Sequence, residues 1–106
     1  MSVLLEFSMF PTSDDCRDGA SVSRYVSRII DMIDLSGVAY QLTPMGTVIE
    51  TDTMREALDI IEKAYEVLDC DRVYSSLKFD IRKGKKDRLT SKIASVQEHL
   101  GRDVRS

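Results

Sequence analysis

Two strand–helix–strand units follow each other along this chain of 106 residues, and their order restricts the possible folds more than any other feature. The apolar run at residues 3–10 is rich in β-formers and predicts a buried strand. A helix is expected from Ser21 to Ser36, with Ser21 as its N-cap, because apolar residues recur three and four positions apart. Two short strands, Val38–Thr43 and Gly46–Thr51, then form a hairpin through a tight connection.

The second unit repeats the order of the first. Thr53 and Glu56 form a capping-box sequence at the start of a second helix. The apolar stripe predicted for this helix consists of Met54, Ala57, Leu58, Ile61, Ala64, Tyr65 and Leu68. Alternating residues predict a fourth strand at Arg72–Ile81, with Leu77 and Ile81 in its core-facing set. The basic segment from Arg82 to Arg88 is expected to be a solvated loop, and a last helix is expected near Thr90–Leu100.

The order βαββαβ followed by a helix favours one fold class. The length fits a single domain covering residues 1–106. The economical arrangement is an α+β ferredoxin-like split βαβ sandwich, in which two helices cover one face of an antiparallel four-stranded sheet. The last helix is an addition at the C-terminal end.

Composition and residue types argue against several classes of function. The chain has 15 Lys plus Arg against 18 Asp plus Glu, and this net charge of −3 argues against nucleic-acid binding. His99 is the only histidine and asparagine is absent, which argues against a Ser-His-Asp device, a His-rich zinc site and an acylphosphatase-like hydrolase. The apolar stretches are too short to span a bilayer, and the N-terminus does not resemble a signal peptide. We expect a non-enzymatic cytoplasmic protein without a metal or cofactor.

Cys16 and Cys70 are the only cysteines and form no C-x-x-C motif. They can meet in space, but two cysteines do not make a disulfide framework. In a cytoplasmic protein we expect them to be reduced thiols.

The sheet face opposite the two helices is expected to be only partly polar. It mixes the apolar residues Leu4, Phe10 and Tyr74 with Glu6, Ser8, Lys78 and, depending on strand register, Glu50. A partly apolar open face indicates a cover, and a second copy of the sheet, assisted by the last helix, is the expected one. Charges between two sheets must pair or hold a ligand. Glu6 and Lys78 therefore either pair across neighbouring strands or contribute to a ligand site.

Several strings in the sequence resemble the small thiamine-binding-protein family. The most specific is Tyr40–Glu50, which contains TPMGT followed by Val48, Ile49 and Glu50. The resemblance also covers Glu6-Phe7-Ser8 with Pro11, Ser21-Val22-Ser23 with Tyr25-Val26, Lys78–Arg82 and Val96-Gln97-Glu98, and so extends over essentially the whole chain. It implies a ferredoxin-like fold, homodimers or homotetramers through the open sheet faces, and a pocket between subunits for thiamine or its hydroxymethylpyrimidine half. The implied role is thiamine salvage, carriage or sensing, without an enzymatic reaction.

The residue types fit that ligand, which has a thiazolium cation and an aminopyrimidine ring. A carboxylate can accept from the amino group, hydroxyls and a backbone N–H can reach the ring nitrogens, and apolar side chains can lie against the flat ring. The predicted ligand-binding residues are Glu6, Ser8, Phe10, Thr43, Met45, Gly46, Thr47 and Glu50. An ordinary hairpin turn uses the residues of 43–47 as well, and Phe10 and Met45 also suit packing. The alternative function is a sensing or structural oligomer with a different ligand.

Overall fold

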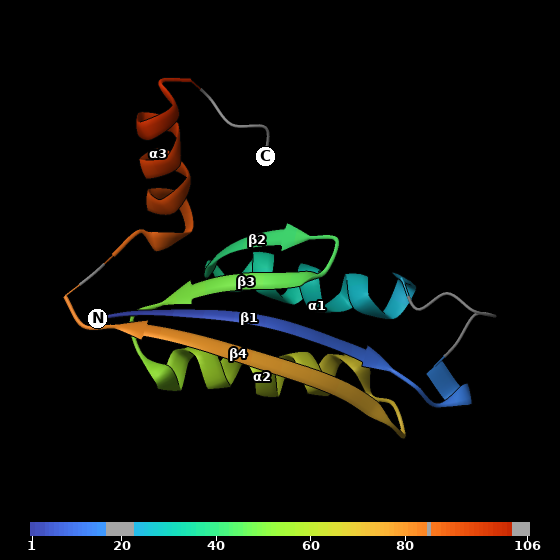
Figure 1. Cartoon of the computed structure of the whole chain (residues 1–106). Coiled ribbons are helices and arrows are strands. Elements are labelled where there is room, and N and C mark those ends of the chain that lie inside the picture. The colour runs from blue at the N-terminus through green and yellow to red at the C-terminus, as the bar shows by residue number, and fades with distance from the viewer. Residues whose placement is uncertain (17–22, 85, 103–106) are drawn as a thin grey trace.

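The computed structural model describes residues 1–16, 23–84 and 86–102, so the predicted N-cap Ser21 lies outside the described residues. The elements follow the predicted order (Figure 1). They are β1 (Ser2–Pro11), the short 3-10 helix η1 (Asp14–Cys16), α1 (Ser23–Ser36), β2 (Ala39–Thr43), β3 (Gly46–Thr51), α2 (Met54–Leu68), β4 (Val73–Arg82) and α3 (Arg88–Leu100).

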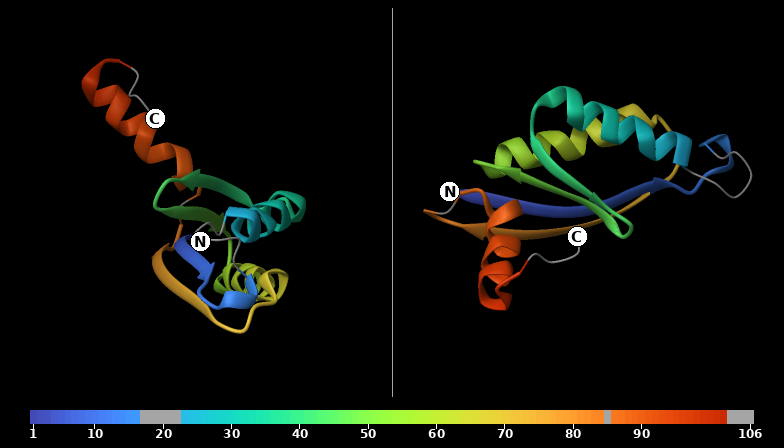
Figure 2. Two further views of the ribbon diagram at one scale, coloured as in Figure 1. Left: turned by 90° about the vertical axis from the view of Figure 1, so that its right-hand side faces the viewer. Right: turned by 90° about the horizontal axis from the view of Figure 1, so that it is seen from above.

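The four strands form one antiparallel sheet in the order β2-β3-β1-β4. Helices α1 and α2 lie side by side on one face of it (Figure 2). Alternate β1 residues Val3, Leu5, Phe7 and Met9 point toward these helices and are buried, as the period of two requires. The predicted ferredoxin-like sandwich is confirmed.

The buried stripe of α2 differs from the predicted one. Ala57, Ile60, Ala64 and Leu68 are buried, and Thr53 caps the helix by accepting from the N–H of Glu56 at 3.1 Å. Leu58 and Tyr65 were assigned to the stripe but are 38% and 57% exposed. Each follows a buried alanine by one residue, which turns it about 100° around the helix axis and away from the sheet.

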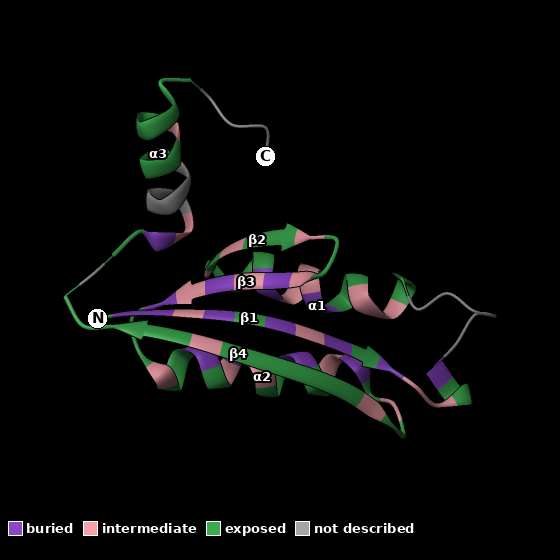
Figure 3. Ribbon diagram, in the orientation of Figure 1, coloured by how far each residue is buried: buried purple, intermediate pink, exposed green. Residues whose placement is uncertain are grey.

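The residues of β4 predicted to face the core do point to that side of the sheet, but they are not buried. Leu77 and Ile81 pair in register with the buried residues Phe7 and Val3, yet they are 40% and 44% exposed. Strand β4 lies at the edge of the sheet and is exposed over most of its length (Figure 3). An alternating pattern identifies the face of a strand but not its position in the sheet.

The expectation of reduced cysteines is wrong. Cys16 in η1 and Cys70 between α2 and β4 form a disulfide across a sequence separation of 54 residues. Their segments are side by side because Pro11 pairs with Val73, and the N–H of Thr12 donates to the carbonyl of Arg72 at 2.9 Å. The pairing follows from the sheet topology and has no local sequence signal.

Helix α3 begins at Arg88, two residues before the predicted start, and stands away from the sandwich on the side opposite α1 and α2 (Figure 2). Val96 and Leu100 on this helix are 44% and 51% exposed. Within the described ranges, no helix has both the length and the apolar character that crossing a membrane requires.

Candidate ligand-binding site

A cavity of about 230 Å³, called the notch below, lies where β3 begins, beside the part of β1 that continues past β3. The β1–β3 register ends at Phe7 and Thr47, so Ser8–Phe10 extend past the last paired position. The β2–β3 turn and the apolar side of α1 close the remaining walls. The predicted ligand-binding residues that line the notch are Ser8, Phe10, Thr43, Met45, Gly46 and Thr47.

The turn at the mouth of the notch is held by Thr43. Its Oγ1 accepts from the N–H groups of Met45 and Gly46 at 3.2 and 3.1 Å and donates to the carbonyl of Gly46 at 2.8 Å. The Thr43 hydroxyl and the Gly46 amide, both predicted as ligand contacts, are therefore already engaged within the turn. Their geometric effect is to fix the shape of the notch.

Gly46 is required by close approach of the backbone. A Cβ at this position would lie 2.8 Å from the carbonyl oxygen of Phe7. Real Cβ atoms do not come so close to a backbone oxygen, so only glycine lets the turn lie against β1. The glycine in TPMGT thus determines the width of the notch.

Two hydroxyls and two apolar side chains in the notch remain available to a ligand. Thr47 is 6% exposed and Ser8 is half-buried, and neither side chain hydrogen bonds to another residue in the described part of the chain. Phe10 is 38% exposed with its ring centroid 6.3 Å from that of Tyr74, and Met45 is 85% exposed at the turn. The notch can therefore offer hydrogen bonds from its interior and flat apolar contacts at its rim.

Glu6 lies on the open face close to the notch. It is two residues from Ser8 on the same face of β1, which corresponds to about 7 Å along the strand. Glu6 pairs in register with Lys78 of β4, both side chains are exposed, and among the described residues they form no ion pair. The Glu6 carboxylate is thus placed near the notch without a partner fixed by the fold.

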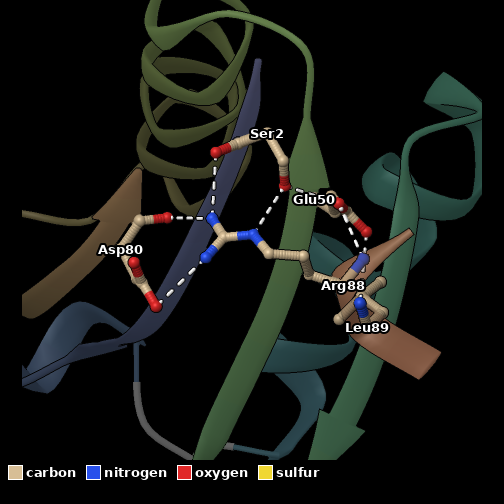
Figure 4. A network of polar contacts seen from close by, with 5 residues as sticks. All are labelled: Ser2, Glu50, Asp80, Arg88 and Leu89. Atoms are coloured by element: carbon tan, nitrogen blue, oxygen red, sulfur yellow. Dashed lines mark hydrogen bonds and ion pairs between the residues drawn. The ribbon is translucent and has the colours of Figure 1, made fainter. Parts of the chain in front are cut away.

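Glu50 lies at the other end of the sheet, in a polar network with α3 (Figure 4). Its Oε2 accepts from the Ser2 hydroxyl at 2.6 Å and from the N–H of Arg88 at 3.0 Å, and its Oε1 accepts from the N–H of Leu89 at 3.2 Å. The carboxylate therefore satisfies the first amides of α3, whose own N-cap Asp87 makes no side-chain capping bond.

The prediction that Arg88 belongs to a solvated loop is wrong. The residue is 9% exposed and its guanidinium donates to the Ser2 hydroxyl and the Ser2 carbonyl, each at 2.9 Å. It also donates to the Asp80 carbonyl and forms a 3.1 Å ion pair with the Asp80 carboxylate. Nothing in the basic run from 82 to 88 distinguishes Arg88, because its partners lie outside the run, on β1 and β4.

The network also sets the charge of Glu50. Burial alone would raise the pKa of Glu50, but the hydrogen bonds from Ser2, Arg88 and Leu89 and the positive charge of Arg88 outweigh it and lower the pKa. The carboxylate is therefore ionised at neutral pH, as an anion at a helix N-terminus should be.

The fold is thus a ferredoxin-like sandwich with a small, partly apolar notch at one end of its sheet. The family model described as "Thiamine-binding protein" matches residues 5–97, and the chain belongs to this family. It is 36% identical over 102 residues to a UPF0045 protein of Mycobacterium bovis, covering 94% of this chain and 96% of the relative. It is also 36% identical over 98 residues to a UPF0045 protein of Methanocaldococcus jannaschii, covering 91% and 93%.

Solved structures support the same fold. A crystal structure of the Methanocaldococcus jannaschii protein matches with a TM-score of 0.76 at 35% identity, covering 92% of this chain and 97% of that one. A Thermotoga maritima protein, described as a candidate thiamine biosynthesis/salvage protein, matches with a TM-score of 0.73 at 20% identity, covering 91% and 99%. This second likeness supports the fold alone.

Proposed function

We propose that the protein binds thiamine or its hydroxymethylpyrimidine half reversibly in the notch, without chemical conversion, in thiamine salvage, carriage or sensing. The observation that carries the proposal is that Ser8, Phe10, Thr43, Met45, Gly46 and Thr47, chosen from the sequence for this ligand, line one cavity. Membership of the thiamine-binding family gives the ligand class.

The chemistry of the notch suits the aminopyrimidine ring. The hydroxyls of Ser8 and Thr47 can donate to ring nitrogens, and the exposed Glu6 carboxylate can accept from the amino group. Phe10 and Met45 can lie against the faces of the ring. Glu50 was predicted for the carboxylate role as well. Because its oxygens accept from Ser2, Arg88 and Leu89, we assign that role first to Glu6.

We also propose that a second copy of the chain completes the pocket, in a homodimer or homotetramer. The notch holds about 230 Å³, below the roughly 300–1,000 Å³ of usual ligand pockets. Its rim residues Phe10 and Met45 are exposed, as are Tyr74 on the open face and Val96 and Leu100 on the outer helix. A partner sheet over the open face would cover such residues and link ligand occupancy to assembly.

Isothermal titration calorimetry tests the binding proposal directly. The purified protein is titrated with thiamine, thiamine phosphate and hydroxymethylpyrimidine, and saturable binding at micromolar or tighter concentrations is expected. Thr47→Val, which keeps the shape of the side chain and removes the hydroxyl, should weaken binding, whereas Thr53→Val at the distant α2 cap should not. Absence of heat with every ligand would overturn the proposal and leave a sensing or structural oligomer with a different ligand.

The assembly proposal has its own measurement. Sedimentation velocity should give a dimer or tetramer, and Phe10→Glu together with Tyr74→Glu should shift it toward monomer by placing charges on the open face. A monomer for the parent chain, with and without thiamine, would contradict it.

A further inference from the structure

A second, larger hollow adjoins the notch between α1 and the edge strand β2. This groove encloses about 590 Å³ and shares Val26, Ile30 and Leu42 with the notch as a common wall. The Tyr40 side chain continues its apolar surface. At 1.5 Å per residue along α1, Val26 and Asp31 are about 7.5 Å apart on the helix axis. Asp31 in the groove is therefore about this far along α1 from the wall that the two hollows share.

The open end of the groove is acidic. Asp31 and Asp34 line it from successive turns of α1, and both residues are exposed. Asp34 is held against the wall because its Oδ1 accepts from the Tyr40 hydroxyl at 3.1 Å. No lysine or arginine is among the lining residues in the described part of the chain. The nearby Arg28 lies over the ring of Tyr25 at 4.8 Å, and Tyr25 does not line the groove.

We propose that this groove is a subsite for a flat heteroaromatic cation, so that thiamine spans both hollows with its pyrimidine in the notch and its thiazolium between Tyr40 and the two aspartates. The assignment of the pyrimidine half rests on the function proposed above. The cation assignment rests on the groove itself, which combines an apolar wall with carboxylates and, among the described residues, has no lysine or arginine in its lining.

The chemistry of a thiazolium explains why this combination suits it. Its nitrogen is quaternary and has no proton to donate, so a directional hydrogen bond cannot recognise it. Its ring gains from contact with apolar side chains and with the face of an aromatic ring such as Tyr40. The cost of partly removing the charge from water must be offset by nearby anions, which Asp31 and Asp34 supply.

The test uses charge-removing variants and ligands that differ in charge. The variant carries Asp31→Asn and Asp34→Asn, where asparagine keeps an oxygen for the Tyr40 hydroxyl. The matched control carries Glu62→Gln and Glu66→Gln, which remove two exposed carboxylates from α2. The ligands are thiamine, its uncharged thiophene analogue 3-deazathiamine, hydroxymethylpyrimidine, and a benzyl-substituted thiazolium without the pyrimidine. Calorimetry at low and high salt measures the affinity of the parent and of each variant for each ligand. Thermal unfolding verifies that both variants are folded.

For the aspartate variant we expect thiamine to bind about 3- to 10-fold more weakly, because exposed charge contacts contribute only modestly. Binding of the thiazolium should weaken similarly, binding of 3-deazathiamine and hydroxymethylpyrimidine should be unchanged, and high salt should remove the difference.

Equal weakening of the binding of charged and uncharged ligands, or unchanged thiamine binding, would overturn the subsite and leave the proposed function intact. If hydroxymethylpyrimidine fails to bind the parent while the thiazolium binds in an aspartate-dependent way, the notch assignment fails and the subsite stands. If the thiazolium and thiamine both fail to bind the parent, the subsite is overturned.

Discussion

The two ends of the sheet are stabilised by different kinds of interaction. At one end, Ser2, Glu50, Asp80 and Arg88 satisfy one another and hold the start of α3. At the other end, the disulfide of Cys16 ties η1 to the α2–β4 connection, and the β2–β3 turn closes on itself. That second end leaves the Ser8 and Thr47 hydroxyls of the notch without hydrogen-bond partners in the described part of the chain.

This difference separates a structural polar group from a candidate binding group. Glu50 has the residue type expected for a ligand carboxylate, but three donors of the fold already occupy its oxygens. Thr47 is less conspicuous in the sequence, yet it lines a cavity and its hydroxyl has no hydrogen-bond partner among the described residues. A polar side chain is a better candidate for binding when the fold leaves it unsatisfied, because a ligand then gains the full hydrogen bond.

The largest effect on stability is expected from removing the disulfide. Replacing Cys16 and Cys70 by serine removes a cross-link across 54 residues, which on chain-entropy grounds lowers the free energy of unfolding by up to about 4 kcal/mol. Urea unfolding with and without dithiothreitol measures this. The parent should lose stability in reductant, whereas the stability of the serine variant should be the same with and without it. Hydrogen exchange of the α3 amides in the serine variant should stay as in the parent. A parent insensitive to reductant would contradict the prediction.

The next largest effect is expected at the end of the sheet where Ser2, Glu50, Asp80 and Arg88 interact, called the polar end below. Glu50→Ala removes the acceptor of two backbone amides and of the Ser2 hydroxyl, while the ion pair between Arg88 and Asp80 stays in place. We expect a loss of about 2–3 kcal/mol, mainly as release of α3 from the sheet. Hydrogen exchange should show faster exchange along α3 with β1 and β3 still protected. Thiamine affinity in the same variant decides whether Glu50 also contacts the ligand.

The same carboxylate gives the polar end a pH dependence. Its folded pKa lies below the ordinary value of 4.5, so the unfolded state binds more protons and stability rises with pH. The contribution of Glu50 is complete above about pH 4.5 and is lost as pH falls through the lowered pKa. Exchange of the α3 amides followed from pH 6 downward measures it. The Glu50→Ala variant is the control and should lack this part of the dependence.

A smaller effect is expected at the notch. Gly46→Ala places a Cβ against the Phe7 carbonyl, which forces the turn away from β1 and costs about 2 kcal/mol. Because the displaced turn widens the notch, ligand affinity should fall as well. Met45→Ala is the matched control, since its 85% exposed side chain contributes less than about 0.5 kcal/mol to folding. Equal stability of the two variants in thermal unfolding would contradict the close approach.

These cases mark what the sequence can and cannot predict. Periodicity and capping signals are local, so the order of the elements, the Thr53 cap and the face of each β1 residue were all predictable. The importance of Gly46 was predictable too, but its reason, the proximity of Phe7, was open until the strands were paired.

Most of the errors share one cause. The disulfide and the capping role of Glu50 depend on residues at least 38 positions apart, and the burial of Arg88 depends chiefly on Ser2, 86 positions away, so no local pattern encodes these pairs. The exposure of Leu77 has a related origin, because it depends on the place of β4 at the edge of the sheet, whereas the exposure of Tyr65 follows from its position around the helix axis. Long-range placement is therefore the part of the site that required the structure.

The smallest effect is expected from removing the charge of Asp80 at the polar end of the sheet. Asp80 interacts with Arg88 through its exposed carboxylate, at 3.1 Å, and through its backbone carbonyl. Asp80→Asn removes only the charge and should cost less than about 1 kcal/mol, an effect that high salt should abolish. Asp59→Asn, which breaks the exposed 3.6 Å pair with Arg55 on α2, should cost a similarly small amount. If Asp80→Asn instead releases α3 as Glu50→Ala does, the ion pair and not the backbone bonds would be holding Arg88 in place.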